Sequence, residues 1–251
     1  MHMQGDRERN KNKGLIEMPG GSSALLLPSL DGPYINWTDV EPRQVYNLPK
    51  RAPDQLIVDL AEELPYGGVV LDYGCGAGRH LRYLSKLGFL LIGIDPGLGQ
   101  LEVADQAAPN AKLNVLHFGT PIPLPDASID GALSTWAMYH ATRSILNWSF
   151  SEILRVLKWG APFFFNLIST RDFKYGVGIE LDRNTYTETR GGSHGELHHF
   201  VDLHELNSIV NRFSRATVTH MVRPLILEPY EEPPINIPNP FCAHWLVKAW
   251  K

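Results

Sequence analysis

Three glycines and two aspartates are the residues of this chain whose types and spacing are best suited to hold a ligand. They are Asp72, Gly74, Gly76, Gly78 and Asp95. Glycine permits positive φ and lets a ligand approach the backbone closely. Asp95 stands about 20 residues beyond the first glycine, where an acidic side chain accepts hydrogen bonds from ribose hydroxyls. Asp72 directly precedes the turn, where its carboxylate attracts positive charge.

The glycine spacing separates two classes of nucleotide site. A dinucleotide site requires the spacing G-x-G-x-x-G. Counted from Gly74 the third glycine position is Arg79, and counted from Gly76 it is Leu81. A carboxylate before the turn also repels a pyrophosphate. S-adenosylmethionine (SAM) carries a ribose and two cationic centres without phosphate, so it suits this pattern better than a dinucleotide.

These residues belong to a strand, turn, helix and strand unit over residues 68–95. The apolar run 69–71 predicts a buried parallel strand, and helical spacing follows over 79–88. A second apolar run over 89–94 predicts the next strand. Such a unit forms a nucleoside crevice at the carboxyl ends of its strands.

Four segments resemble the class I SAM-dependent methyltransferases. VLDYGCGAGRHL is similar to the first motif of that family and IGIDP to the second, while LPDASIDGALS and EILRVLKWGAPFFF are similar to the segments leading into its fourth and fifth strands. The resemblance covers residues 69–167. It implies an α/β fold with a Rossmann-like, doubly wound, seven-stranded and mostly parallel sheet, one antiparallel strand, and helices on both faces. It also implies SAM as the cofactor and S-adenosylhomocysteine (SAH) as the product.

Apolar patterns predict the remaining elements. Further strands are expected at 113–118, 129–134, 163–168, 216–221 and 243–250, and helices at 54–64, 97–108, 144–158 and 202–213. Residues 1–24 are expected to form a flexible tail and 25–251 a single domain. Within that domain, 25–66 is a segment that caps the cofactor, and 169–201 is an insertion over the mouth of the site.

The resemblance assigns a set of cofactor contacts to this chain. Pro96 is expected against the adenine, and the π face of Trp136 beside the sulfonium. Thr120 stands where the family often has an aspartate for the adenine amino group, and its hydroxyl can also accept. The full expected set is Tyr46, Asp72, Gly74, Cys75, Gly76, Gly78, Asp95, Pro96, Thr120 and Trp136.

The residues after the fourth predicted strand are candidates for the acceptor side. His140 is the best-placed general base near neutral pH, although family members often carry a histidine here without using it so. His199 is a second catalytic candidate if it faces inward. Substrate contacts are expected from Tyr34, Trp37, Tyr139 and His198, with core packing as the alternative for the aromatic residues before the first strand.

A histidine cluster raises the question of a metal site. The imidazoles of His194, His198, His199 and His204 suit zinc, nickel or iron. Their spacing fits no defined site, however, and neighbours such as His198 and His199 point to opposite sides of an extended chain. We therefore expect pocket-lining or surface histidines and no metal.

Composition and charge limit the partners. The chain has 251 residues, 43% of them hydrophobic and 20% charged, and a net charge of −4. This describes an ordinary globular enzyme without a basic field for nucleic acid. Two cysteines and the absence of an apolar run near 18 residues point to a cytoplasmic protein without disulfides or membrane contact. The sequence leaves the oligomeric state open.

The expected reaction is methyl transfer from SAM to an oxygen, nitrogen or sulfur atom of a small-molecule acceptor. One alternative is a methyltransferase of tRNA, of the wobble-uridine type, or of protein, for which Arg171, Lys174, Arg183 and Arg190 supply a thin basic surface. A second alternative is an oxidoreductase that uses a dinucleotide. A third is a non-catalytic SAM-binding module, suggested by Thr120 and by the altered turn at Trp159.

Overall fold

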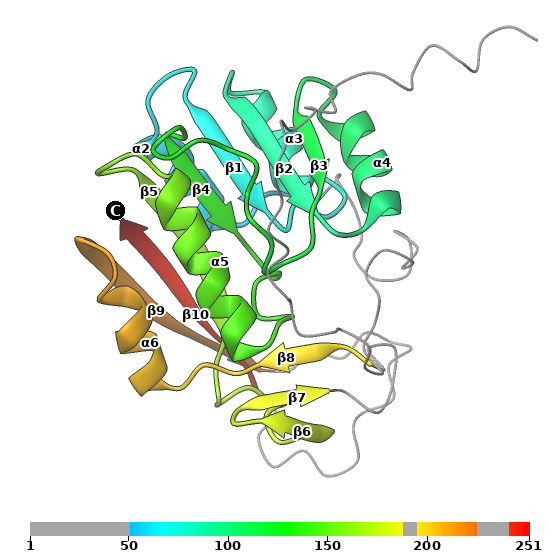
Figure 1. Cartoon of the computed structure of the whole chain (residues 1–251), viewed down its shortest axis with the longest axis vertical. Helices are drawn as coiled ribbons and strands as arrows, with labels where there is room; N and C mark the ends of the chain where they lie inside the picture. The colour runs from blue at the N-terminus through cyan, green and yellow to red at the C-terminus, as the bar shows by residue number, and fades with distance from the viewer. Residues whose placement is uncertain (1–50, 188–194, 225–240) are drawn as a thin grey trace, which may run out of the picture. The chain divides into compact units, whose positions relative to one another are not determined.

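The computed structural model describes residues 51–187, 195–224 and 241–251. Seven of its strands form one sheet in the order β3-β2-β1-β4-β5-β10-β9 (Figure 1). These strands are β1 (Val69–Tyr73), β2 (Leu90–Asp95), β3 (Lys112–Val115), β4 (Gly131–Ser134), β5 (Pro162–Ile168), β9 (Arg215–Pro224) and β10 (Phe241–Trp250). The helices are α2 (Gln55–Glu63), α3 (Arg79–Ser85), α4 (Leu98–Ala107), α5 (Arg143–Val156) and α6 (Leu203–Val210).

The strand pairing confirms the predicted sheet. The neighbouring pairs among β1 to β5 are all parallel. Strand β10 is antiparallel to both of its neighbours, β5 and β9, so it is the one antiparallel strand of the seven. β1 runs on through Asp72 and Tyr73, whereas the sequence placed the end of the strand at Asp72.

Two apolar cores lie on opposite faces of the sheet. On one face, Phe150 of α5 and Leu206 of α6 pack with the aromatic side chains of β5. On the other, Leu60 of α2, Leu81 of α3 and Leu101 of α4 form a second core. Because a parallel sheet needs cover on both faces, this arrangement confirms the doubly wound architecture and fixes the edge at which the strands end.

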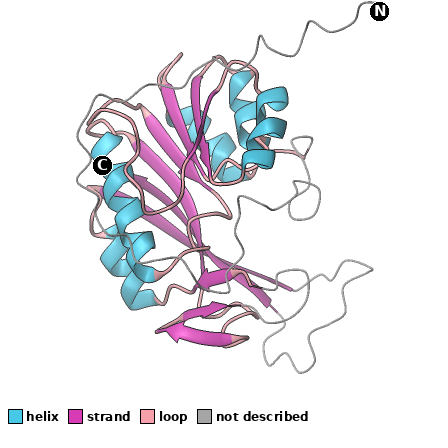
Figure 2. Cartoon of the chain, turned by 45° about the vertical axis from the view of Figure 1, so that its right-hand side comes forward, coloured by secondary structure: helices cyan, strands magenta, loops and turns pink. Residues whose placement is uncertain are grey.

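The predicted insertion contains a small sheet of its own. It is formed by β6 (Ile179–Asp182), β7 (Thr185–Thr187) and β8 (Leu197–His199), paired antiparallel in that order. Figure 2 shows it beyond the ends of the main-sheet strands. The backbone N–H of His199 donates to the carbonyl of Tyr139 at 2.8 Å, and Val201 donates to Ile168 at 2.8 Å. The insertion is thereby joined to the chain leaving β4 and β5.

Several predicted features lie outside the described residues. These are the expected tail over 1–24, most of the cap segment over 25–66 with Tyr34, Trp37 and Tyr46, and also Arg190 and His194. Among the helices of the described ranges, none has the length and apolar character needed to cross a bilayer.

The close packing of α3 on α4 at Gly78 gives a first prediction. Gly78 has φ +81°, and a Cβ there would lie 2.9 Å from the Cα of Ala104. Gly88, which follows α3, has φ +84° and open space where a Cβ would be. Gly88→Ala should cost about 1 kcal/mol of backbone strain, whereas Gly78→Ala should cost at least about 2 kcal/mol because steric overlap is added to the strain. Urea unfolding of both variants measures this, and equal losses would contradict the packing argument.

Candidate active site

The glycine turn after β1 adopts the predicted positive φ values. They are +84° at Gly74, +50° at Gly76 and +81° at Gly78. A Cβ on Gly74 would overlap the side chain of Ala137 in the loop after β4, so this glycine allows two loops to meet. A Cβ on Gly76 would meet no atom of the described residues within 4 Å. Gly76 also lines the pocket, so the space beside it is available to a ligand.

Four N–H groups of this turn are already used by the protein. Those of Gly74 and Cys75 donate to the carbonyl of Ile94 at 2.7 and 3.0 Å, and that of Gly78 donates to the carbonyl of Cys75 at 3.0 Å. The N–H of Gly76 donates to Oδ2 of Asp95 at 2.9 Å. A phosphate site relies on free backbone donors at such a turn, so the bonds of these four groups disfavour a pyrophosphate here.

Asp95 connects the turn to the start of α4. Its second oxygen, Oδ1, accepts from the N–H of Gly97 at 2.8 Å. Burial raises the pKa of Asp95 to about 6, although the hydrogen bonds from Gly97 and Gly76 act in the opposite direction. A carboxylate has about four acceptor positions, so Asp95 keeps capacity for hydroxyl groups of a ligand.

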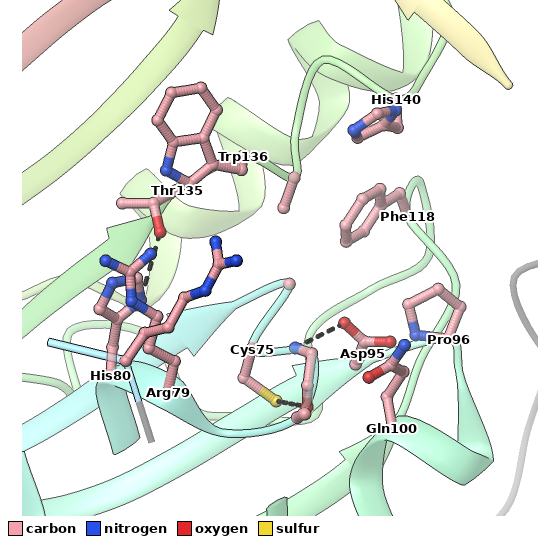
Figure 3. Close-up of a pocket in the computed structure, with 15 residues that line it drawn as sticks. Cys75, Arg79, His80, Asp95, Pro96, Gln100, Phe118, Thr135, Trp136 and His140 are labelled. Carbon is pink, nitrogen blue, oxygen red and sulfur yellow. Dashed lines mark hydrogen bonds between the residues drawn. The ribbon is translucent and has the colours of Figure 1, made fainter. Parts of the chain in front are cut away.

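A pocket opens at the carboxyl ends of β1, β2 and β4 (Figure 3). Seven of the predicted site residues line it, namely Gly74, Cys75, Gly76, Asp95, Pro96, Trp136 and His140. The sequence interpretation missed eight others, which are Arg51, Ala77, Arg79, His80, Gln100, Phe118, Thr135 and Ala137. Phe118 ends the predicted strand over 113–118 and Thr135 directly follows the one over 129–134, so a search at the carboxyl ends of the predicted strands would have found both. His80 and Gln100 depend on the rotation of their helices, which residue spacing alone did not indicate.

Three predicted cofactor residues of the described ranges lie outside the pocket lining, namely Asp72, Gly78 and Thr120. Asp72 is buried, and its Oδ2 has no hydrogen-bond partner among the described residues. Burial raises the pKa of the Asp72 carboxyl, and the charge of Asp95 adds to the rise. Thr120 directs its hydroxyl to the carbonyl of His117 at 2.6 Å. At this edge the pocket is instead lined by the aromatic ring of Phe118. That ring stacks on Tyr73, with 4.9 Å between the ring centroids.

Asp54 holds one side of the pocket together. The sequence predicted it as the cap of α2, but its side chain makes no capping hydrogen bond. It instead pairs with Arg79 at 2.9 Å, accepts from the indole of Trp136 at 3.0 Å, and lies 3.3 Å from His80. Burial acts to raise the pKa of Asp54, but the contacts with His80 and Trp136 and the charge of Arg79 outweigh it and lower the pKa to about 2.

Trp136 is held in an uncommon backbone conformation after β4. Its φ is +58°, which is unusual for a large side chain. Its N–H donates to Oδ1 of Asn166 at 2.6 Å, and its indole N–H reaches Asp54. Such strain persists only where surrounding contacts enforce it, and it clusters at functional sites. The ring therefore keeps a fixed orientation at the pocket wall.

His140 lies beside the pocket as predicted, but its pKa does not suit the predicted role. Burial lowers the pKa of His140 to about 3, and the charge of Lys174 acts in the same direction. So low a pKa makes the imidazole a weak proton acceptor at neutral pH. The structure therefore argues against a general-base role for His140.

The neighbouring histidines of β8 point in opposite directions. His198 lies near Tyr139 and His140, with ring centroids 6.0 and 4.7 Å away. His199, the second catalytic candidate, is fully buried and turns toward α6. Its Nε2 lies 3.1 Å from both carboxylate oxygens of Glu205, and its Nδ1 lies 2.7 Å from the hydroxyl of Thr185. These contacts occupy both ring nitrogens of His199, while His198 faces Tyr139 and His140.

Comparison with known proteins identifies the family. Residues 71–165 match the family described as a methyltransferase domain. This stretch is a methyltransferase domain of the class I SAM-dependent type. Over 105 residues it is 34% identical to malonyl-[acyl-carrier protein] O-methyltransferase of Yersinia pestis, and the match covers 41% of this chain and 38% of that protein. The chain therefore spans well under half of the length of this curated relative.

Two solved structures share the methyltransferase fold. A SAM-dependent methyltransferase from Methanosarcina mazei superposes with a TM-score of 0.59 at 17% identity, covering 80% of this chain and 99% of that one. The 1,6-didemethyltoxoflavin-N1-methyltransferase of Burkholderia thailandensis gives 0.55 at 16% identity, covering 78% and 76%. The latter was solved with 1,6-didemethyltoxoflavin and SAH bound.

The residues of this methyltransferase pocket fit SAM. Gly76 leaves room for a ligand against the backbone, and Asp95 has acceptor capacity for a ribose. The buried Asp72 oxygen without a partner among the described residues favours a cation nearby. Phe118 and Pro96 offer apolar surface to a base.

The low pKa of Asp54 predicts a dependence of stability on pH. Folding lowers the pKa of Asp54 from 3.8 to about 2. At pH values well above 3.8, this shift stabilises the folded protein by about 2 kcal/mol. That contribution disappears as the pH falls from 4 toward 2. Asp54→Asn should therefore lose about 2 kcal/mol of unfolding free energy at pH 7 and about half of that near pH 3, as measured by urea titration at both pH values.

Asp126→Asn is the control for that experiment. The Asp126 side chain is 78% exposed and pairs with Arg155. Exposed pairs contribute little, so this variant should remain close to the wild type at both pH values. An equal loss for Asp54→Asn at pH 7 and pH 3 would show that the charge of Asp54 is not responsible.

Proposed function

We propose that this protein transfers a methyl group from SAM to an oxygen, nitrogen or sulfur atom of a small-molecule acceptor. The observation that carries the proposal is the division of hydrogen bonds at the glycine turn. Four N–H groups of the turn donate to Ile94, Cys75 and Asp95, while Asp95 keeps acceptor capacity in the pocket. This combination suits a nucleoside with hydroxyl groups and no phosphate, and it disfavours the dinucleotide oxidoreductase considered above.

The bound cofactor would supply an electrophilic methyl group. A lone pair of the acceptor forms the new bond to the methyl carbon as the carbon–sulfur bond breaks, and the bonding electrons remain on sulfur in SAH. The protein then contributes mainly by holding the two reactants in line, which can lower the barrier by several kcal/mol.

The pocket residues divide into two groups for this task. Asp95 would accept from the ribose, with Phe118 and Pro96 against the base. Arg51 and Arg79 line the opposite part of the pocket and would attract the carboxylate of the methionine moiety. The rigid Trp136 ring would lie beside the sulfonium, a contact worth about 1 kcal/mol.

The surroundings of the acceptor side favour a small molecule over tRNA. Arg183, one of the residues of the predicted basic surface, pairs with Asp202 at 3.2 Å. Lys174 is close enough to the half-buried His140 and the buried His198 for its charge to lower both of their pKa values. Neither residue therefore adds to an extended basic surface of the kind that binds nucleic acid.

Substitution of Asp95 tests the cofactor site. Asp95→Ala should weaken SAH binding in calorimetry at pH 7 by about tenfold or more, because ribose hydroxyls lose a charged acceptor. Asp105→Ala, at an exposed position of α4, is the matched control and should bind normally. Unchanged affinity of Asp95→Ala would remove this residue from the site.

The raised pKa of Asp95 predicts weaker cofactor binding in acid. Below its pKa of about 6, the protonated carboxyl has lost its charge and part of its acceptor capacity. SAH affinity should fall between pH 7 and pH 5, by at most about tenfold per pH unit for one proton. Asp95→Asn should bind weakly with a flat profile over this range. A flat profile in the wild type would contradict the assignment.

An acceptor screen tests the reaction itself. The purified protein, SAM and a panel of small hydroxyl, amine and thiol compounds would be assayed for SAH release, with transfer RNA as a separate arm. Turnover with a small molecule supports the proposal. Turnover confined to RNA, with binding that weakens steeply in salt, would replace the acceptor class. SAM binding without turnover on any acceptor would favour a non-catalytic module.

A further inference from the structure

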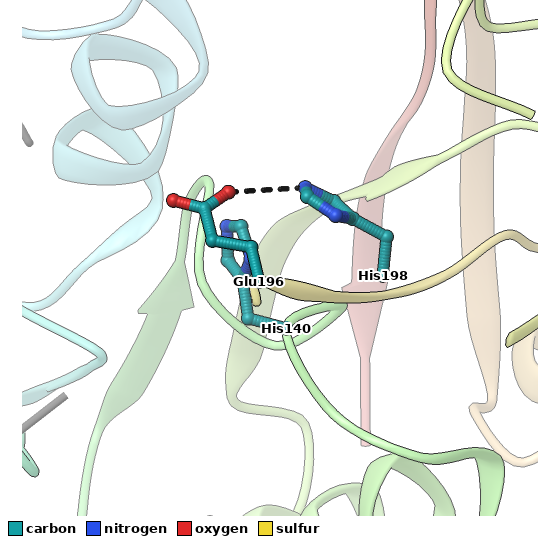
Figure 4. Close-up of side chains that lie close together, drawn as sticks. All are labelled: His140, Glu196 and His198. Atoms are coloured by element: carbon teal, nitrogen blue, oxygen red, sulfur yellow. Dashed lines mark ion pairs between the residues drawn. The ribbon is translucent and has the colours of Figure 1, made fainter. Parts of the chain in front are cut away.

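Three side chains that could share a metal ion meet between the small sheet and the chain leaving β4. They are His140, Glu196 and His198, and one ligand atom of each lies within 4.8 Å of the others (Figure 4). Nε2 of His198 lies 3.5 Å from Oε2 of Glu196. This cluster differs from the one that the sequence suggested, because only His198 is common to both.

Backbone pairing brings these residues together. Strand β8 is paired with β7 at His198 and Tyr186. The N–H of His199 also donates to the carbonyl of Tyr139 at 2.8 Å, which places His198 beside the residue that follows Tyr139. These main-chain contacts hold His198 next to His140, and Glu196 stands two residues before His198 in the same segment.

The donor set has the chemistry of a transition-metal site. Two imidazoles with one carboxylate bind zinc in several hydrolases and iron in oxygenases, and such sites leave positions open for a further ligand. Glu196 and His198 are buried.

The spacing is compatible with a shared ion. Bonds of about 2.1 Å from a common ion permit ligand atoms up to about 4.2 Å apart. The three ligand atoms lie within 4.8 Å of one another, so only small side-chain rotations are needed to bring them to such distances. Lys174 opposes a cation, since its charge acts on both histidines. That repulsion disfavours weakly bound Mg²⁺ and leaves metals with strong affinity for imidazole.

We infer that His140, Glu196 and His198 form a binding site for a divalent transition-metal ion of the Zn²⁺ and Co²⁺ class. Since His140 also lines the pocket assigned to SAM, an open coordination position would hold an oxygen or nitrogen atom of the acceptor beside the methyl donor. This role toward the acceptor rests on the proposed function. Metal binding itself does not.

Calorimetry with Zn²⁺ and absorption spectroscopy with Co²⁺ test the site on the full chain after treatment with a chelator. The wild type should bind one ion that His198→Ala and Glu196→Gln bind more than about 100-fold more weakly, because each removes a ligand. The matched control is His204→Ala, which removes an exposed histidine of α6 and should bind as the wild type does. The Co²⁺ spectrum should show the intense visible bands of a low-coordinate site only where His198 is present.

Three results would overturn the inference. They are absence of Zn²⁺ binding to the wild type, equal affinity in His198→Ala and wild type, and loss of binding in His204→Ala instead. SAH affinity measured on the same samples separates the two proposals and checks the fold. Normal SAH binding without metal binding removes the metal site and leaves the methyltransferase proposal intact. Metal binding without SAH binding would support the metal site and count against the methyltransferase proposal.

Discussion

The carboxylate of Asp95 is the interaction on which the cofactor pocket depends. It accepts from Gly76 in the turn after β1 and from Gly97 at the start of α4, so one side chain sets the distance between two neighbouring strand ends. The positive φ values of the turn are possible because glycine has no Cβ, and they aim the Gly76 N–H at Asp95. The same hydrogen bonds occupy donors that a phosphate could otherwise use. The way in which the fold satisfies its own backbone thus favours a nucleoside without phosphate.

A second set of contacts fixes the other side of the pocket. Asp54 joins the start of α2 to α3 through Arg79 and to the loop after β4 through the indole of Trp136. Since three separate segments converge on one charge, moving any of them would change the shape of the methionine end of the pocket. This explains how Trp136 maintains its positive φ: its backbone and its ring are each held by a hydrogen bond.

The histidines show how burial changes the meaning of a residue type. In sequence, His140 is a base with a pKa near neutrality, and His199 is an equal candidate beside His198. In the fold, His140 loses basicity because little water is left to stabilise its charged form. His199 is bound on both nitrogens by Thr185 and Glu205. His140 and His198 are left as neutral imidazoles near a carboxylate. Such groups are better suited to bind a metal ion than to accept a proton.

The sequence by itself determined the strands beside the glycine turn, the turn itself and the acid expected to bind the ribose. These features are local, because a strand, a turn and a helix start lie within one stretch of chain and the acid follows at a characteristic interval. It therefore predicted Gly74, Gly76, Gly78, Asp95 and the order of the elements. Only the tertiary structure decided the partners of Asp54, the pKa of His140, and the meeting of His140 with Glu196 and His198. Those depend on which distant segments pack together and on how much water they exclude. A one-dimensional pattern records neither, since the side-chain spacing within β8 says nothing of the loop that pairs with it.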